Sequence, residues 1–599
     1  MSREPSVRVA KRGAVLGAVA VVVASLGAVA TAAAGPVATA AAGPVSRAAG
    51  TAPSGNQLRA AIAKRLGNQA RLSSGVRMWL NPPTASPRAR LALPGVRFGT
   101  NVDANDPAHD VAAGQSETAI AAQKAPGGRR LVMVGWNDVS GFFAPPTTRA
   151  GSATGVAVSE DGGRSFTDLI GLPNNNTDQQ WSGDPSITSL GDGVHFAVAS
   201  LYYPSVAACA DGLPAHGTVA VTIATVQHTA AGPQTTFTAP TEVSQPGDLC
   251  ALFTSPNPPP NLASLDKDWI SYDRASRTVA ISYTRFYYPT FVCGPTTCTT
   301  AGHSGNGQIE VARAHLPTDP TALSAADFTH PAMVWPEEAS CPIGVPSSEQ
   351  LRCGAVNQGA YVAVAAGGGS YVAWERNVDS NLGDGDPYVY EHAALVPAGA
   401  NAAATGGPAA PVVLTTGQPN STRDGGVKSL DAVIIPGYNR GSGNDFPRLA
   451  VDNTRGRVVF AWNDASAHPL GNIWLRTASL SLSTLSATHR VDDGTSYALH
   501  FLPAVSVRSD GTICTSWYDR HRGGATSTVT DYYADCRTNP AVNAADVPIS
   551  TGSTDWAGTG SLITPNFGDY TDNTTDGTHT YFTWSDGRIG VPQPFTDSR

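Results

Sequence analysis

The sequence of 599 residues is poor in charge and in cysteine, and each scarcity narrows what the protein can be. Only 14% of the residues are charged, and the formal net charge is −8. A chain with this acidic balance lacks the basic surface that the nucleic-acid backbone requires, which argues against nucleic acid as a main partner. Glycine (62) and proline (45) are abundant instead, and they indicate many short strands joined by many turns.

An apolar segment near the N-terminus predicts export. Four basic residues lie within the first twelve positions, the apolar run covers 14–34, and small-residue cleavage sites occur at its end and just after it. The alternative is a permanent membrane anchor, since the run is about long enough to span a bilayer. We expect a cleaved signal peptide over 1–34, because the run is mostly Ala and Val. No cysteine precedes Cys209 to carry a lipid, and the polar residues 593–599 form no anchor. The expected product is a secreted, extracellular monomer without membrane contact.

The eight cysteines agree with an oxidising destination. They occur as four sequence neighbours, Cys209 and Cys250, Cys293 and Cys298, Cys341 and Cys353, and Cys514 and Cys536. Four sequential disulfides are the simplest arrangement, although spacing alone does not fix the pairing. The last pair is the best argued, because its members lie in consecutive apolar strands and could face each other. The spacing of Cys293 and Cys298 also fits a metal-ligand pair. No second pair of ligands follows, which favours a disulfide that closes a loop.

Residues 35–95 form a separate zone. Gly35 to Gly55 is rich in Ala, Gly, Pro and Ser and is typical of a flexible linker. Gln57 to Leu72 has apolar residues at helical spacing and predicts a short amphipathic helix. The remaining body, 96–599, is expected to be one β domain.

One sequence phrase recurs along this body. A polar residue opens a short apolar run, a Gly/Asp/Asn turn follows, and a second apolar run ends on an aromatic residue with a polar or charged neighbour. The clearest copy is Asp445 to Asp464, and a weaker one runs from Asp184 to Ser200. Other copies end at Trp136, Tyr283, Trp374, Trp517 and Trp584. This gives about seven copies, which is typical of a propeller or an array of short-stranded units.

The clearest copy also shows the strands of one unit. We expect strands over 448–451, 458–462, 473–480 and 488–491. Four antiparallel strands per unit predict an all-β fold, a β-propeller of four-stranded antiparallel blades, with seven blades favoured and six as the alternative. The last unit is short, so strands from the N-terminal part are expected to complete it and close the ring.

A motif follows the third strand of the first unit. Residues 159–166, Ser-Glu-Asp-Gly-Gly-Arg-Ser-Phe, match the Asp box, S-x-D-x-G-x-[S/T]-[W/F]. Its Asp and Ser side chains can bond turn amides, its Gly permits a positive φ, and its aromatic ring can enter the blade core. On this motif, over about 97–599, the chain resembles the sialidase superfamily of Asp-box, or bacterial neuraminidase repeat, propellers. The resemblance implies a structural role for Ser159, Asp161, Gly163, Ser165 and Phe166.

Strand direction predicts where a site would lie. The first strand of each blade starts on the face where the second strand ends, and polar residues gather at both places. A mouth lined by convergent charges is the usual location of a binding site. The candidate catalytic residues are Glu117, Asp184, Asp268 and Tyr570, and the candidate substrate-binding residues are Lys267, Arg285, Arg376, Arg448, Arg520 and Arg588. The alternative for any one of them is structural, as a turn cap or an ion pair.

The resemblance implies a glycosidase mechanism at this mouth. Sialidases use a Tyr nucleophile with a Glu partner, an Asp acid/base and three Arg that clamp the substrate carboxylate. Arg285, Arg376 and Arg520 occupy equivalent positions in three units, which suits such a clamp. The Arg-Ile-Pro signature of the family is absent, the Asp box occurs once, and sialidases have six blades. The catalytic assignment therefore rests on the residues and not on a family signature.

An acidic loop follows the fourth unit's second strand. Asp379, Asn381, Asp384 and Asp386 place oxygen ligands in a Gly-containing segment, which would suit Ca²⁺. The spacing differs from an EF-hand, and the alternative is a solvated acidic turn. No other cofactor is indicated.

Three functions remain open. The first is a secreted, glycoside hydrolase-like propeller that acts on glycans at its mouth. The second is a non-catalytic carbohydrate- or cell-wall-binding propeller. The third is a scaffold for protein interactions. Whether the protein is an enzyme is left open, because fold alone does not decide it.

Overall fold

A computed structural model describes residues 100–599 of the chain, apart from 107–113, 143–148, 175–179, 204–216, 244–262, 288–290, 294–297, 301–303, 329–331, 340–353, 379–387, 400–409, 423, 468–469, 494–497, 525 and 543. The predicted signal peptide, linker, amphipathic helix and acidic loop 379–386 lie outside these described residues, and so do the side chains of six cysteines. Those predictions remain untested.

The described chain is a propeller of seven antiparallel blades, as predicted, and its first strand in each blade lies innermost. Blade 1 contains β2 (Gln115–Lys124), β3 (Arg130–Asp138), β4 (Thr154–Ser159) and β5 (Thr167–Asp168). Blade 2 contains β6 (Gln180–Trp181), β7 (Ser186–Ser189), β8 (His195–Tyr203), β9 (Thr218–Thr229), β10 (Gly232–Phe237) and β11 (Thr241–Glu242). Blade 3 contains β12 (Ala263–Asp273), β13 (Thr278–Tyr287), β16 (Gln308–His315) and β17 (Ala332–Trp335).

Blades 4 to 6 repeat the arrangement, and blade 7 combines strands from both ends of the described chain. Blade 4 contains β18 (Val356–Val364), β19 (Ser370–Val378), β20 (Tyr388–Val396), β21 (Val412–Val413) and β22 (Val427–Lys428), and blade 5 contains β23 (Arg448–Asp452), β24 (Arg457–Asp464), β25 (Asn472–Ser479) and β26 (His489–Arg490). Blade 6 contains β27 (His500–Val507), β28 (Ile513–Asp519), β29 (Val529–Arg537), β30 (Val547–Pro548) and β31 (Thr554–Asp555). Blade 7 contains β32 (Asp572–Thr575), β33 (Thr580–Asp586), β34 (Gln593–Ser598) and β1 (Val102–Asp103).

Short elements lie between these strands. A separate hairpin pairs β14 (Phe291–Cys293) with β15 (Cys298–Thr300). The 3-10 turns in the described residues are η2 (Pro126–Gly128), η3 (Val139–Phe142), η4 (Arg149–Gly151), η6 (Pro320–Ala322), η7 (Ala325–Asp327) and η9 (Leu430–Ala432). No helix in the described ranges has the length and apolar character needed to cross a membrane.

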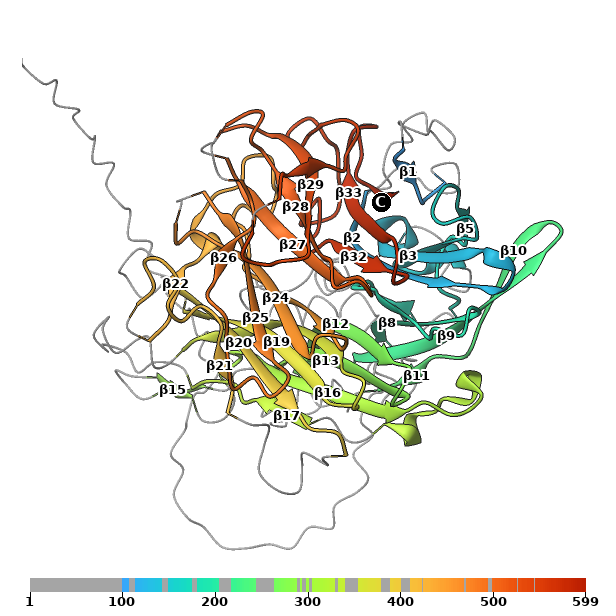
Figure 1. The fold of residues 1–599 in the computed structure, drawn as a ribbon, viewed down its shortest axis with the longest axis horizontal. Helices are drawn as coiled ribbons and strands as arrows, with labels where there is room; N and C mark the ends of the chain where they lie inside the picture. Colours follow the sequence, from blue (N-terminus) through green and yellow to red (C-terminus); the bar gives the residue numbers. More distant parts are fainter. Residues whose placement is uncertain are drawn as a thin grey trace, which may run out of the picture. The chain divides into compact units, whose positions relative to one another are not determined.

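The ring is closed by pairing the beginning of the described chain with its end (Figure 1). β1 pairs antiparallel with β34, with Val102 opposite Thr596 and Asp103 opposite Phe595. The innermost strand of each blade contacts those of the two adjacent blades, from β2 through β32 and back to β2. Seven blades and closure by an N-terminal strand are therefore both confirmed.

The strand boundaries agree with the repeat phrase. In blade 5 the predicted strands 448–451, 458–462, 473–480 and 488–491 match β23 to β26 to within two residues at each end. Cys514 of β28 lies opposite Cys536 of β29, and the two form a disulfide, as predicted.

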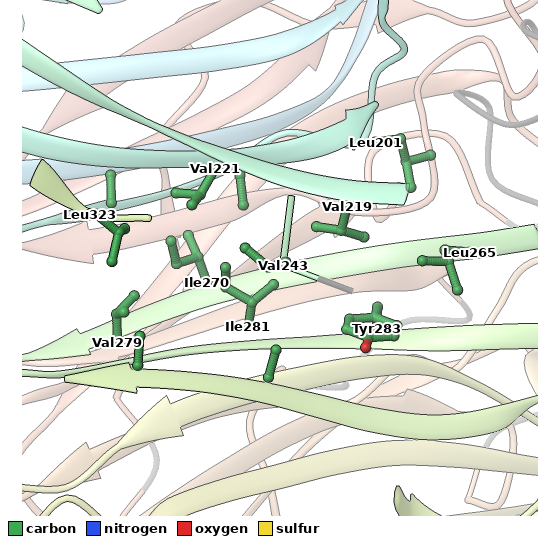
Figure 2. Packing of buried hydrophobic residues seen from close by; sticks show 14 of the residues in the cluster. Leu201, Val219, Val221, Val243, Leu265, Ile270, Val279, Ile281, Tyr283 and Leu323 are labelled. Atoms are coloured by element: carbon green, nitrogen blue, oxygen red, sulfur yellow. The ribbon is translucent and has the colours of Figure 1, made fainter. Parts of the chain in front are cut away.

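Apolar side chains fill the space between neighbouring blades (Figure 2). Val219 and Val221 of β9 lie above Ile270 of β12 and Ile281 of β13, and all four are at most 2% exposed. Burial of a branched aliphatic side chain stabilises a fold by roughly 1.5 to 3 kcal/mol. Layers of this kind between blades hold the inner strands, and the polar groups at their ends, in fixed positions.

The aromatic end of the repeat phrase has a structural role. The indole N–H of Trp462, Trp517 and Trp584 donates to the carboxylate two residues later, at 2.9, 3.2 and 2.8 Å. Each indole and each aspartate is buried. A buried indole N–H needs a partner, so in these three blades the Trp-x-Asp phrase satisfies its own polar group at the end of the second strand.

The residue between Trp and Asp connects neighbouring blades. Asn137 of blade 1 accepts the backbone N–H of Asp184 in blade 2 at 2.5 Å, and Asn463 of blade 5 accepts that of Leu502 in blade 6 at 2.9 Å. We call this contact the inter-blade latch. It fixes the start of one inner strand against the preceding blade.

Residues 159–166 fold into a tight turn between β4 and β5. Asp161 accepts the backbone N–H groups of Arg164 and Ser165 and the hydroxyl of Ser159. Gly163 has a φ of 84°, and Phe166 packs partly buried against the core of blade 1. The side-chain bonds, the positive φ and the packed ring are those expected from the sequence.

Candidate functional site

The inner strands begin with a repeated backbone irregularity. Glu117, Asp184, Lys267 and Leu502 have φ between 54 and 56°, and Gly359 has a φ of 70°. In blades 1, 3, 4 and 6 the pairing of the first two strands shifts register at this position. A positive φ is uncommon for residues with a Cβ, and such strain concentrates at functional sites. We call the face that carries these starts, and the ends of the second strands, the mouth face.

Two carboxyl groups meet over one amide on the mouth face. The Asn137 amide nitrogen donates to Glu117 Oε2 at 2.6 Å and lies 3.3 Å from Asp184 Oδ1. Both acidic side chains are completely buried. Because they share one donor, the two carboxyl groups are held side by side.

A lysine joins this pair to a third carboxyl group. Lys267 Nζ lies 3.1 Å from Asp569 Oδ2 and 3.7 Å from Glu117 Oε1, and the side chain is 5% exposed. The other oxygen of Asp569 pairs with Arg440 Nη1 at 2.5 Å. The backbone N–H of Asp569 donates to Glu117 Oε1 at 3.2 Å. Charges from blades 1, 3 and 7 are thereby joined to an arginine that lies between β22 and β23.

Tyr570 forms the inner wall of this arrangement. Its ring centroid is 4.7 Å from Lys267 Nζ, and its hydroxyl donates to the carbonyl of Pro185 at 3.3 Å. Burial, and then the carboxylates of Asp184 and Glu117, raise the pKa of Tyr570 well above its usual range. This environment opposes the tyrosinate that a nucleophilic role requires. We call Glu117, Asp184, Lys267, Asp569 and Tyr570 the mouth cluster.

The protonation of the mouth cluster is unusual. Burial raises the pKa of Glu117 to about 8; the positive charge of Lys267 opposes the shift, and Asp184 and Asp569 add to it. The carboxylates of Asp569 and Glu117 raise the pKa of Lys267 although burial lowers it. Glu117 therefore keeps its proton near neutral pH beside a charged ammonium group, which is the condition of a general acid.

Asp268 lies at the edge of the mouth cluster. Its Oδ2 accepts the hydroxyl of Ser186 at 3.1 Å, and its Oδ1 has no hydrogen-bond partner within the described chain. Burial, and then the charge of Asp184, raise its pKa well above the usual range. The four candidate catalytic residues of the sequence are thus brought together, although they come from blades 1, 2, 3 and 7.

Arg448 lies deeper along the axis, in an aromatic surrounding. Its guanidinium carbon is 4.9 Å from the Trp269 ring centroid, 5.1 Å from that of Tyr361 and 5.3 Å from that of Tyr570. The side chain is buried, and burial lowers its pKa. Arg448 therefore packs under the mouth cluster instead of forming its rim.

The other four predicted arginines have partners outside the mouth cluster. Arg285 pairs with Glu310 at 2.8 Å, Arg376 with Glu338 at 2.5 Å, and Arg588 with Asp586 at 2.5 Å. Arg520 donates to the carbonyls of Pro436 and Ser527, and burial lowers its pKa to about 9.

A second group of carboxyls lies between blades 4 and 5. Glu375 of β19 faces Glu391 of β20 and accepts the Asp445 backbone N–H at 3.0 Å. Burial, and then Asp431, raise the pKa of Glu375 to about 7. Burial, and then Glu375, raise the pKa of Glu391 well above its usual range, and neither of its oxygens has a hydrogen-bond partner in the described residues.

Sequence reasoning missed the groups that complete the mouth cluster. Arg440, Tyr438 and Asn444 all contact Asp569 from the segment before β23. This segment has no strand periodicity, so no position in it could be assigned to a face. Its one signal was a run of Tyr, Asn and Arg among glycines at 437–443.

No group of three or more His, Cys, Asp or Glu side chains among the described residues is arranged to hold a metal ion. The predicted calcium ligands Asp379, Asn381, Asp384 and Asp386 fall outside those residues. What the mouth cluster offers chemically is proton transfer and charge stabilisation by its own side chains.

The sequence matches no protein-family model and no curated protein. Solved structures of propeller proteins are similar at low identity. The Hadza microbial sialidase Hz136 is 8% identical, with a TM-score of 0.36, over 74% of this chain and 73% of its own. A Penicillium chrysogenum α-L-arabinanase complexed with arabinobiose is 8% identical, with a TM-score of 0.36, over 84% of this chain and 98% of its own. A Dyadobacter fermentans protein of unknown function is 10% identical, with a TM-score of 0.38, over 84% and 99%.

Likeness at this level describes fold alone. Fold and geometry together define a seven-bladed β-propeller with a buried cluster of carboxyl groups and a lysine at the starts of its inner strands.

Proposed function

We propose that this protein is an exported propeller that acts on glycans in the manner of a glycoside hydrolase, with its chemistry in the mouth cluster. One observation carries the proposal. Glu117 is a buried carboxyl group with a pKa of about 8, held beside a second carboxyl group, Asp184, by the amide of Asn137.

Hydrolysis of a glycoside needs two carboxyl groups with different roles. One gives a proton to the leaving oxygen, and the other acts as nucleophile or base on the opposite side of the sugar ring. Glu117 fits the first role because it is protonated at neutral pH. Asp184 fits the second, and since both oxygens contact the same nitrogen, at 2.6 and 3.3 Å, they are less than about 6 Å apart. An upper limit of this size favours the shorter separation of retaining enzymes over the roughly 6.5 to 9.5 Å of inverting enzymes.

The experiment is a screen of the purified mature protein on glycosides that include sialosides, uronides and neutral sugars. Replacing the acid, Glu117→Gln, keeps the size of the side chain and one of its two hydrogen-bond acceptors but removes the transferable proton. We expect kcat/KM on any substrate found to fall by at least about 100-fold. The wild-type rate should decline as the pH rises through about 8, since Glu117 must be protonated to act.

Glu160→Gln is the matched control. Glu160 pairs with Arg129 and His228 away from the mouth face, so its loss should leave turnover unchanged. Full activity of Glu117→Gln would refute the assignment of the acid, and unchanged thermal unfolding of both variants would show that each is folded.

A non-catalytic glycan-binding propeller is the second candidate. It is favoured by the burial of the mouth cluster, in which no acidic side chain is more than 1% exposed. This function predicts glycan binding without turnover by the wild-type protein. Neither binding nor turnover on the panel would favour the interaction scaffold.

A further inference from the structure

A polar hollow lies at the opposite end of the blades from the mouth cluster. It has a volume of about 430 Å³ and is bordered by residues of blades 1 and 7. Arg130 at the start of β3, the turn Asp161–Arg164, and His579 and Tyr581 around the start of β33 contribute to it. The end of β34 and the start of β1 complete its wall. All these positions lie at strand ends remote from the mouth face.

The acidic groups of this hollow are already satisfied by their own loops. Both oxygens of Asp161 accept hydrogen bonds within the turn, from residues 159, 164 and 165. Asp597 accepts the Thr100 hydroxyl at 2.8 Å, the Asn101 amide at 3.0 Å and the Ser598 backbone N–H at 2.6 Å. These carboxylates therefore have little remaining capacity to accept hydrogen bonds from a ligand.

The donors, in contrast, retain unused capacity. Arg130 contacts Asp576 through Nε at 3.3 Å, and its Nη1 and Nη2 make no hydrogen bond within the described chain; the side chain is 39% exposed. His579 uses Nδ1 toward Thr578 at 3.0 Å, which leaves Nε2 for another group. Arg164 of the turn also lines the hollow, and the proposal does not depend on it.

We propose that this hollow binds an acidic sugar unit, a hexuronate, through its carboxylate. Arg130 and His579 donate to the carboxylate, because an arginine fork binds a carboxylate with two hydrogen bonds. The glycine pair 162–163, at φ of 79 and 84°, leaves the wall of the hollow without side chains at that point. A hollow of this size holds a whole sugar ring beyond the anionic group.

The ligand would bridge the seam of the ring. Its contacts come from blade 1 and from three strands of blade 7, one of which precedes all the others in sequence. A ligand that binds only the closed ring stabilises it by mass action. Binding should therefore raise the temperature of unfolding as well as produce heat of binding.

The test is isothermal titration calorimetry of the purified protein with sodium D-glucuronate, with D-glucose and sodium sulfate as comparison ligands. We expect glucuronate to bind and to raise the unfolding temperature, and glucose to do neither. Arg130→Gln and His579→Ala should each weaken glucuronate binding at least tenfold. Two variants are used because Arg130 also pairs with Asp576, whereas His579→Ala keeps the backbone bonds of its turn.

Arg129→Gln is the matched control, since Arg129 adjoins Arg130 but pairs with Glu160 and does not line the hollow. It should bind glucuronate as tightly as the wild type. Glu117→Gln should also bind it as tightly, which would show that glucuronate binds in the hollow and not at the mouth cluster. The proposal would be overturned if the wild-type protein does not bind glucuronate, or if Arg130→Gln and His579→Ala both bind it as tightly as the wild type. Sulfate binding as tight as that of glucuronate would also overturn the assignment of a sugar.

Discussion

Glu117 shows how one residue can be strained, buried and protonated at once. Its φ of 55° sets its side chain among groups from blades 1, 3 and 7, and its neighbours include both a carboxyl group and an ammonium group. A carboxyl group in such surroundings costs stability when it ionises. That cost is measurable whether or not the protein is an enzyme.

The folded protein should lose stability as the pH rises from about 5 to 8. Glu117, Glu375 and Asp572 have pKa values raised to about 8, 7 and 7, so the folded chain holds protons that the unfolded chain releases above about pH 4.5. The stabilisation is fully present below that pH and is lost as the pH passes through the raised pKa values. Urea unfolding at several pH values measures it.

The Glu117→Gln variant should remove part of this dependence, on the order of 3 kcal/mol between pH 5 and 8. Asp424→Asn, at an exposed position, is the control and should keep the wild-type slope. A Glu117→Gln curve parallel to that of the wild type would contradict the raised pKa.

At this scale the sequence predicted part of the site. Glu117, Asp184 and Lys267 were found because they start strands whose direction could be read from the repeat. Arg440 and Asn444 were not, because contacts made by an irregular segment depend on its path through space. The same limit applies to Arg285 and Arg376, whose partners Glu310 and Glu338 come from strand or loop positions without a spacing rule.

The repeated sequence phrase contains residues that fix the end of a strand and residues that connect one blade to the next. In blades 5, 6 and 7 the indole of the Trp-x-Asp phrase bonds the aspartate at the end of the second strand, and in blades 1 and 5 the middle residue forms the inter-blade latch. The phrase was recognised from the sequence as a repeat. Its polar residues at the strand ends had two interpretations, a functional and a structural one. The partner across the blade boundary could not be predicted, because it depends on the angle between adjacent sheets.

Asn463→Ala should destabilise the protein by about 3 kcal/mol. The amide of Asn463 donates to the Asn444 carbonyl and to Asp445 and accepts the N–H of Leu502, and truncation leaves buried partners unsatisfied. Denaturant unfolding measures the loss. Ser483→Ala, at an exposed turn, is expected within about 0.5 kcal/mol of the wild type. A latch variant as stable as this control would show that the latch contributes little.

For the molecule as a whole, the number of blades followed from counting the phrase, and closure followed from the shortness of the last unit. The hollow between blades 1 and 7 could not be foreseen, because it exists only where segments about 490 positions apart come together.

Removing residues 1–105 should destabilise the protein by about 3 kcal/mol or more and promote association. The truncation deletes β1 and the bonds of Asn101 to Ile549 and Asp597, and it exposes the edge of β34. Denaturant unfolding and light scattering measure the two effects. A chain that starts at residue 96 keeps β1 and is the control; equal stability of the two truncated chains would contradict a role for β1 in closure.

The pairing of Val102 with Thr596 also has a consequence for biosynthesis. Thr596 follows Val102 by about 490 positions, so β1 has no partner in the ring while the strands of blades 1 to 6 are being translated. Blade 7 can be assembled only when β34 has been made, although one of its strands is translated before all the other described strands.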